Sequence, residues 1–457
     1  MGDLQPFHRP LFDRFIALSR QPSNARYQQL MAVGGDRFTL EIANSCIKNM
    51  RAASDLAVNL TVAEKKSKSW MTATSVEPGF SMLSDWNRAF DLIAKKAVSS
   101  QDPRPPFNEA DLPEEFEPLR RYDPDIASLL PAVVFHRIFQ SFGKFIEQGF
   151  LIDADCAYTN GFYSPKNSPL CFAFVDDTHF CFQPQTTLFE SVCIRHRDNP
   201  ALRRYAHQTS SKLDDFMRLD SLAAELQNVD TSRLIAFNPM AFDDIILMPG
   251  AASQLAQYLL RPFDIAPETT TLPDKSQKCL SESLELACDP SDPCFGRDCA
   301  FDVHGIKTAP IRLISNGLPD TIPTGGAIAK KHHLPNNGHA TANGHAEPFC
   351  PVLKSAQDVD LPTFSSTAQF TAGSNRLVLC IEHLQLFALD DSTTAVQFSS
   401  GGVLCQNGRC CAHVAPPDKP FVLQPLLDSA RPASAPTRIG ALASCALKLD
   451  PAAFKTP

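Results

Sequence analysis

The sequence predicts an α+β protein of two lobes, an N-terminal α/β lobe over residues 1–229 and a mostly antiparallel β lobe over residues 230–457. Apolar residues at helical spacing occur in the first half of the chain, whereas short apolar runs between turn residues dominate the second half. A length of 457 residues exceeds one ordinary domain, and a hydrophobic content of 44% is sufficient for a sizeable core.

Two helices are predicted in the first 150 residues. Ser84 is a candidate N-cap, and Trp86, Ala89, Phe90 and Ile93 follow it at the spacing of one helical face. Residues 129–149 contain Pro131 for a first turn, Gly149 for a stop, and one apolar stripe between them. The stripe consists of Phe135, Ile138, Phe139, Phe142 and Ile146. His136 is interpreted as an ordinary helix-face residue.

Between and after these helices the pattern changes. Six prolines in residues 101–125 predict an extended, loop-like link, because proline interrupts both helices and strand pairing. Short apolar runs on both sides of Asp176–Asp177 predict a hairpin, and residues 187–196 predict a further strand. Residues 210–228 return to helical spacing, which closes the N-terminal lobe.

The second lobe opens with two predicted strands, residues 233–237 and 243–250, and then a short helix at 251–260. Residues 311–315 predict a strand followed by a turn at Asn316–Gly317. Residues 376–389 and 401–416 predict strands. Asn407–Gly408 within the latter is the strongest hairpin signal of the chain, because a type I′ turn needs positive φ at both central residues.

Charge and hydropathy exclude several classes of function. A net charge of −8 and a pI near 5.8 argue against nucleic-acid binding, which needs a basic surface. No run of eighteen apolar residues predicts a membrane span, and the first fifteen residues lack the pattern of a secretory signal. We therefore expect a soluble, cytoplasmic protein with no nucleic-acid or membrane partner.

Residues 332–346, HHLPNNGHATANGHA, hold four of the twelve histidines and repeat the sequence Asn-Gly-His-Ala. Three interpretations are open: adventitious metal binding by His332, His333 and His339, a loop that contacts a peptide or a partner, and a solvated loop with no role. The contact residues would be Asn337, Gly338, His339 and His345. Catalysis is disfavoured, because glycine and asparagine surround the imidazoles and Glu347 is the only carboxylate nearby in sequence.

The fifteen cysteines are expected to be free thiols, because their number is odd and no export signal precedes them. Two groups, Cys288, Cys294 and Cys299 and then Cys405, Cys410 and Cys411, lack the C-x-x-C spacing of a structural zinc site. The pairs Cys380/His383 and Cys411/His413 leave a cysteine nucleophile open as a weaker hypothesis. The glycine pairs in AVGGDRF and PTGGAIAKK are interpreted as bare turns, and AKKHH as a solvated turn.

The order of the segments resembles the TldD/PmbA (TldE) family. Residues 243–260 are similar to its strand, proline, small residues and helix, NNGHATANGHAEPFCP occupies the place of its Thr-Gly-Asn/His loop, and GGVLCQNGRCCAHV resembles its closing hairpin. A further similar block consists of Gly305, Thr308, Leu313, Ile314 and Gly317. The resemblance extends over nearly the whole chain and implies a TldD/PmbA-like fold of two lobes.

In that family the TldD-type subunit resembles a zinc peptidase, whose helix after this strand carries H-E-x-x-x-H. Here the corresponding residues read AASQLAQYLLRPFDIA, and the motif occurs nowhere in the chain. The resemblance is therefore to the metal-free PmbA/TldE branch. It implies no catalytic residue and no metal in this chain, a zinc-bearing TldD-like partner, and a shared chamber in which unfolded or precursor peptides are cleaved. The alternative is a stand-alone binding or scaffold protein on a decayed peptidase fold.

Overall fold

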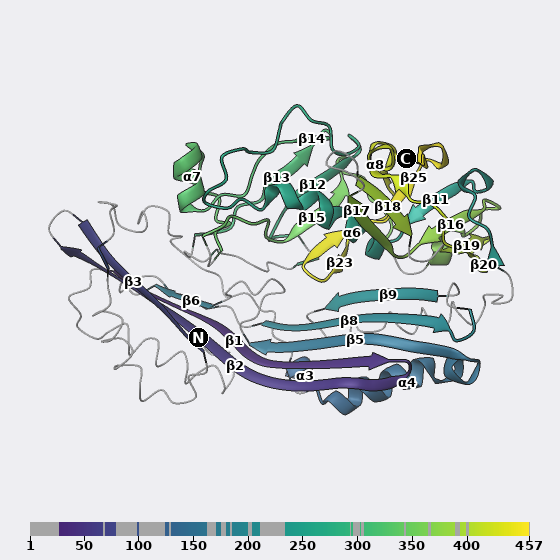
Figure 1. The fold of residues 1–457 in the computed structure, drawn as a ribbon, viewed down its shortest axis with the longest axis horizontal. Coiled ribbons are helices and arrows are strands. Elements are labelled where there is room, and N and C mark those ends of the chain that lie inside the picture. Colours follow the sequence, from purple (N-terminus) through teal and green to yellow (C-terminus); the bar gives the residue numbers. More distant parts are fainter. Residues whose placement is uncertain are drawn as a thin grey trace.

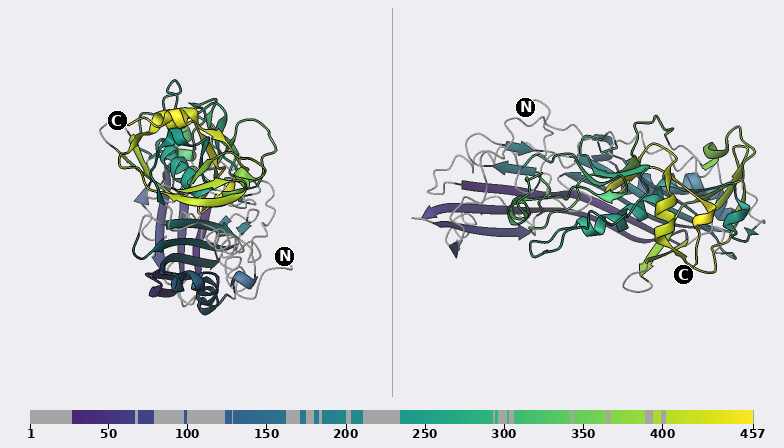
Figure 2. Two further views of the ribbon diagram at one scale, coloured as in Figure 1. Left: turned by 90° about the vertical axis from the view of Figure 1, so that its right-hand side faces the viewer. Right: turned by 90° about the horizontal axis from the view of Figure 1, so that it is seen from above.

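The computed structural model of the chain (Figure 1) has the two-lobe α+β architecture that the sequence predicts. It describes residues 27–66, 69–78, 98–99, 124–127, 129–161, 171–174, 180–182, 185–199, 203–210, 234–292, 294–295, 302, 306–341, 344–363, 367–388, 394–398 and 402–456. Long strands of the N-terminal lobe extend beneath and beyond the C-terminal lobe (Figures 1 and 2). No helix among the described residues is long and apolar enough to cross a membrane.

One antiparallel sheet forms most of the described N-terminal lobe. Its strands are Tyr27–Ala43 (β1), Cys46–Lys66 (β2), Ser69–Pro78 (β3), Val98–Ser99 (β4), Phe150–Gly161 (β5), Cys171–Phe174 (β6), Phe180–Phe182 (β7), Gln185–His196 (β8) and Arg203–Ser210 (β9). The order is β4-β3-β2-β1-β5-β8-β9, and the β6–β7 hairpin joins through β1. The hairpin around Asp176–Asp177 and the strand at 187–196 are thereby confirmed as β6, β7 and β8.

The long hairpin of β1 and β2 was not predicted from the sequence. Asn44 and Ser45 form its turn with φ values of 51° and 63°. Gly34 and Gly35, interpreted as a bare turn, instead lie inside β1 opposite Leu56 and Asp55 of β2. That interpretation was wrong because cross-strand pairing keeps the glycines extended. The signal was present further along, since burial alternates with exposure from residue 37 to residue 42.

Helix α4, Pro131–Glu147, confirms the predicted helix and packs on β5 and β1. Pro131 occupies its first turn, and Gly149 follows its end with a φ of 89°. Ile138 and Phe142 of the predicted stripe are completely buried, whereas His136 is exposed as expected. The side chains of this stripe fill the core between the helix and the sheet.

Three N-terminal predictions fall largely on residues outside the described ranges. The helix that begins near Ser84 and most of the link at 101–125 lie outside them. So does the helix at 210–228, except for Ser210, which ends strand β9. The last two residues of that link begin the short helix α3, Pro124–Ala127, so the extended interpretation was wrong there. Proline suits a first helical turn, where its missing N–H has no partner to lose.

The C-terminal lobe contains three sheets. Their orders are β10-β20-β19-β16-β11-β25-β22, β14-β13-β12-β15-β24-β23 and β17-β18-β21. The strands are Leu234–Ile235 (β10), Asp244–Leu247 (β11), Leu284–Cys288 (β12), Ile311–Ser315 (β13), Leu318–Pro319 (β14), Pro351–Ser355 (β15), Val378–Ile381 (β16), Leu384–Ala388 (β17), Thr394–Phe398 (β18), Val403–Gln406 (β19), Arg409–Val414 (β20), Phe421–Val422 (β21), Arg431–Pro432 (β22), Thr437–Ile439 (β23), Leu442–Ser444 (β24) and Leu447–Leu449 (β25). Most described pairs are antiparallel; β10/β20, β11/β16 and β15/β24 are parallel.

The turn predictions in this lobe are confirmed. Asn407 and Gly408 have φ values of 52° and 72° between β19 and β20, and Asn316 and Gly317 form a similar turn between β13 and β14. Asparagine and glycine tolerate this left-handed region, which explains why the dipeptide predicted both turns.

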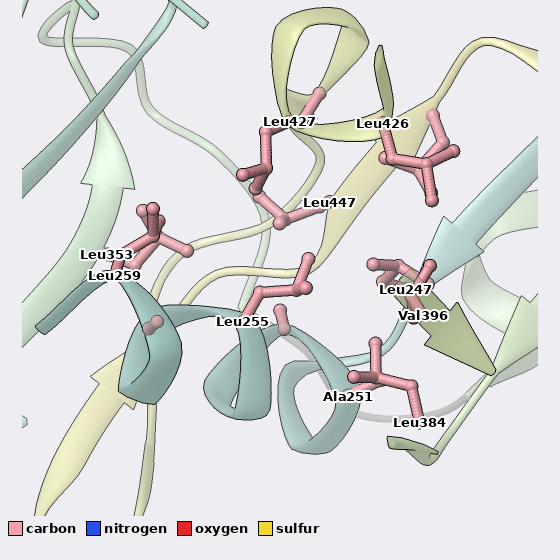
Figure 3. Packing of buried hydrophobic residues seen from close by; sticks show 14 of the residues in the cluster. Leu247, Ala251, Leu255, Leu259, Leu353, Leu384, Val396, Leu426, Leu427 and Leu447 are labelled. Atoms are coloured by element: carbon pink, nitrogen blue, oxygen red, sulfur yellow. The ribbon is translucent and has the colours of Figure 1, made fainter. Parts of the chain in front are cut away.

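Helix α6, Pro249–Leu260, lies in the centre of the C-terminal core (Figure 3). Its residues Ala251, Leu255 and Leu259 face apolar side chains from several strands and from α8, Leu423–Ser429. Each buried leucine contributes roughly 1.5–3 kcal/mol relative to exposure. The apolar face of this helix therefore serves the fold, and only its other face is available for function.

Two sequence interpretations in this lobe were wrong. Residues 376–389 form two strands in different sheets, because the chain turns at Glu382 and His383 between β16 and β17. The lysines of AKKHH lie in a short helix, α7, Gly326–His332, and not in a turn. His333 ends this helix in a left-handed conformation with a φ of 54°.

Candidate functional site at the junction of the two lobes

Strand β9 of the N-terminal lobe meets the C-terminal lobe at Glu382 and His383, the residues where β16 ends. Arg204 of β9 is 1% exposed, and its Nε and Nη2 atoms each lie 2.6 Å from Oε1 of Glu382. The backbone N–H of Tyr205 donates to the other carboxylate oxygen at 2.8 Å. A buried ion pair thus joins the lobes, and both oxygens of its carboxylate are engaged.

Aromatic rings continue the junction beside this ion pair. The ring of His383 stacks on the ring of Tyr205, with their centroids 4.7 Å apart. The centroid of the His207 ring lies 6.5 Å from that of His383. His207 also reaches the start of α6, where a Cβ added to Gly250 would lie 3.0 Å from its Cδ2 atom. Glycine at this position therefore permits the close approach of the two lobes. Thr209 makes a further link by accepting a hydrogen bond from the N–H of Gly440 at 2.6 Å.

Burial keeps the imidazoles of the junction neutral. It lowers the pKa of His207 to about 4, with a smaller contribution from His383. Burial also lowers the pKa of His383, with Arg203 adding to the effect. The pKa of His413 is lowered to about 4 by burial and then by Arg204. Neutral imidazoles can exchange hydrogen bonds with uncharged groups such as peptide amides, but they contribute no positive charge near pH 7.

Helix α6 carries no side chain suited to zinc. Zinc in proteins is held by imidazole, thiolate or carboxylate groups. Of the polar side chains with longer reach on this helix, Gln254 accepts a hydrogen bond from the N–H of Leu384, Tyr258 is hydrogen-bonded to Thr394, and Gln257 is exposed. The donor set of this helix therefore does not fit a zinc ion, and no chemical step can be assigned to a metal there.

Gly338–Thr341 and Ala346 of the histidine-rich segment are buried, so its description as a solvated loop was wrong for these residues. Asn337 holds it in place: its side chain donates to the carbonyl of Ile322 at 2.9 Å and accepts from the N–H of Thr324 at 2.7 Å. Gly338 is buried with a φ of 71°, and an added Cβ would clash with the carbonyl of Lys307. These two predicted contact residues have clear structural roles.

The two remaining predicted contact residues differ from each other. His339 is completely buried; its Nδ1 lies 3.0 Å from the Asn337 side-chain oxygen, and its ring stacks on Phe349. Contact of this buried ring with a peptide, a partner or a metal stays a prediction. His345 is partly exposed, and its Nδ1 lies 3.1 Å from Oδ1 of Asp264. Contact of Asn337 and His345 with a peptide or a partner stays a prediction.

Seven of the twelve described cysteines are buried, four are partly buried and Cys46 is exposed. All twelve whose state is described are free, which confirms the free-thiol prediction for them. The Cys380/His383 pair is not assembled, because the thiol of Cys380 faces the carbonyl of Thr367 whereas His383 stacks on Tyr205. The thiol of Cys411 faces the carbonyl of Leu404. Every resolved shift of a cysteine pKa is upward, which is opposite to an activated nucleophile. The main cause is burial for Cys156, Cys193, Cys279 and Cys445, and a hydrogen bond to a neighbouring cysteine for Cys405 and Cys410.

Comparison with known proteins agrees with this geometry. Residues 242–415, which include β11, α6, the histidine-rich segment and the β19–β20 hairpin, match the family described as PmbA/TldA metallopeptidase C-terminal domain. Residues 242–415 thus carry a C-terminal domain of the TldD/PmbA type. No curated protein matches the chain.

Solved structures of similar fold extend the likeness to the whole chain. TldE from Thermococcus kodakarensis is 14% identical with a TM-score of 0.63, over 96% of this chain and 98% of that one. A candidate modulator of DNA gyrase from Thermotoga maritima is 12% identical with a TM-score of 0.59, over 96% and 98%. Another from Bacteroides thetaiotaomicron VPI-5482 is 13% identical with a TM-score of 0.60, over 98% of both chains. At these identities the likeness concerns the fold, so the TldD/PmbA-like two-lobe architecture is confirmed.

Proposed function

We propose that this chain is the non-catalytic, TldE/PmbA-like subunit, without the catalytic zinc, of a heteromeric TldD/TldE-type metallopeptidase that cleaves unfolded or precursor peptides in the cytoplasm. Its partner is a TldD-like subunit that carries the zinc, and this chain shapes the chamber and holds the peptide. Neither nucleic acid nor a membrane is a partner in this proposal. The observation that carries it is the composition of α6, which by the resemblance corresponds to the family's zinc helix and contains no histidine, cysteine, aspartate or glutamate.

The junction supports a binding role better than a hydrolytic one. Hydrolysis of a peptide bond needs an activated nucleophile and a group that accepts its proton. The carboxylate of Glu382 is held by Arg204 and Tyr205, so it is not poised as a general base. The neutral rings of His207 and His383 and the phenol of Tyr205 are suited to hydrogen bonding and stacking against a peptide.

Association and cleavage can be tested together. The chain and its cognate H-E-x-x-x-H subunit are purified separately and mixed, and cleavage of an unfolded protein is followed by mass spectrometry. We expect a stable complex and cleavage by the mixture. Replacement of the glutamate of the partner's zinc motif by glutamine serves as the control and abolishes cleavage.

Three other results would contradict the proposal or favour its alternative. Cleavage by the partner alone at the rate of the mixture would contradict the proposal. A chain that stays monomeric and does not bind the partner would favour the stand-alone scaffold protein. Proteolysis by this chain alone, with the partner absent, would contradict both.

A further inference from the structure

A group of potential metal ligands lies at the other end of α6, away from the junction. Asp264 follows the 3-10 turn Arg261–Phe263 (η5) that extends this helix, while His345 and Glu347 lie near the end of the histidine-rich segment. One ligand atom from each of the three residues lies within 4.8 Å of the other two. Among the residues that the structure describes, this is the one such group of three or more histidine, cysteine, aspartate or glutamate residues.

The backbone fixes the three side chains toward one another. Ile265 and Ala346 exchange two hydrogen bonds of 2.9 Å, which form an antiparallel bridge between the two segments. Ile265 and Ala346 are 1% and 0% exposed and pack with Ile328. Successive residues of an extended chain point to opposite sides, so His345 and Glu347 both point away from the core to which Ala346 belongs. Asp264 precedes the bridge and meets them from the facing segment.

Further hydrogen bonds hold the segment that carries His345. The carbonyl of His345 accepts from the N–H of Thr341 at 2.9 Å, and the N–H of Glu347 donates to the carbonyl of His339 at 3.0 Å. His339 is itself immobilised against Phe349, as described above. The ligand group therefore rests on a rigid frame, which is the condition for a metal site that exists before the metal binds.

We propose that Asp264, His345 and Glu347 bind one divalent transition-metal ion of the zinc class. One imidazole and two carboxylates are donors that zinc accepts, and three protein ligands leave a position for water. The side chains of Asp264 and His345 are 52% and 31% exposed, so an ion can enter from solvent. The bound ion would fasten the end of α6 to the histidine-rich segment, which are 81 residues apart in sequence.

This site lies outside the residues of α6 considered for the proposed function and does not rest on it. It differs from the sequence-based expectation that the chain holds no metal. That expectation came from the missing H-E-x-x-x-H motif and from the view that Glu347 was the only nearby carboxylate. Asp264 is 81 residues away from His345 in the sequence, so the sequence alone did not indicate that these ligands lie together. A simple ion pair between His345 and Asp264 is the competing explanation.

Measuring zinc binding to the full chain distinguishes a metal site from a simple ion pair between His345 and Asp264. The purified chain is stripped with a chelator and titrated with zinc chloride in competition with a chromophoric chelator, and its thermal unfolding is followed with and without zinc. We expect one zinc per chain and a rise in the unfolding temperature. His345→Ala should weaken binding by more than about tenfold, which is at least the effect of losing a group that supports a metal ligand. Asp264→Asn and Glu347→Gln should weaken it as well.

His333→Ala is the matched control, because His333 belongs to the same segment but is exposed at the end of α7. It should leave zinc affinity unchanged. Equal zinc affinity of the wild type and His345→Ala would overturn the site, and so would a chain that binds no zinc. If a variant failed to fold, the wild-type stoichiometry and the milder Glu347→Gln variant would still decide. Because peptide cleavage is not the readout, failure here is distinguishable from failure of the proposed function.

Discussion

The histidine-rich segment and the lobe junction place their imidazoles in opposite ways. In the segment, histidines that are close in sequence lie in different surroundings: His333 follows the end of α7, His339 is buried in the core, and His345 contacts Asp264. In the junction, Arg204, Tyr205 and His207 come together with Glu382 and His383 from about 180 residues later. The four histidines therefore do not form one site although they are close in sequence. The junction residues form a group in space although they are far apart in sequence.

The largest effect is expected from breaking the ion pair of the junction. Glu382→Gln leaves Arg204 buried without its charge partner and should lower the free energy of unfolding by about 3–5 kcal/mol. Urea denaturation measures this decrease in the free energy of unfolding. Glu41→Gln removes the exposed pair with Lys48 and serves as the control, for which little change is expected. Equal effects of the two substitutions would mean that the buried pair does not join the lobes.

The repeated Asn-Gly-His-Ala sequence offers a matched pair of glycines. Gly338→Ala would combine a φ of 71° with a clash against Lys307, and we expect a loss of about 2–5 kcal/mol. Gly344→Ala has a φ of 83°, but the nearest atom is 3.5 Å away on Pro267, so a loss of about 1–2 kcal/mol is expected. Equal losses in thermal or urea unfolding would indicate that the first repeat is not the more tightly packed one.

Acid should weaken the junction through His207. Its pKa is about 4 in the folded chain and near 6.5 when exposed, so between these values only the unfolded chain takes up the proton. The free energy of unfolding is therefore highest above pH 6.5 and falls as the pH drops toward 4, by at most about 3 kcal/mol from this group. His207→Gln should flatten the dependence of urea denaturation on pH. His413 contributes in the same direction and stays in the variant, so an unchanged slope would show that His207 is not the source.

Local sequence signals were reliable where a short element depends on its own residues. Pro131, Gly149 and the apolar stripe predicted α4, and Asn-Gly predicted two turns, because helix ends and type I′ turns are set by nearby backbone preferences. Apolar and polar residues alternate along residues 37–42, as in a strand, but Gly34–Gly35 just before them is also a common turn sequence, so the β1–β2 hairpin was not predicted. In the structure the conformation of the two glycines is set by pairing with β2, which belongs to tertiary structure.

The candidate sites were harder to predict for the same reason. The break in residues 376–389 falls at Glu382, a charge directly after the buried residues of β16, and this charge was the one local signal of the junction. Its partner Arg204 lies in another lobe, so no spacing rule connects the two. The absence of metal ligands from α6, in contrast, follows from the sequence alone, because all residues of an H-E-x-x-x-H motif lie within one helix.

In the proposed complex, α6 of this chain contributes no catalytic group, and the zinc-bearing partner hydrolyses the peptide. The most direct measurement keeps the partner at a fixed concentration, adds increasing amounts of this chain, and records the rate of peptide cleavage with zinc present. We expect a rate near zero for either protein alone and a rise that saturates at a defined ratio of the two. Substantial cleavage by this chain alone, or a cleavage rate of the partner that does not change when this chain is added, would show that the division of roles is different.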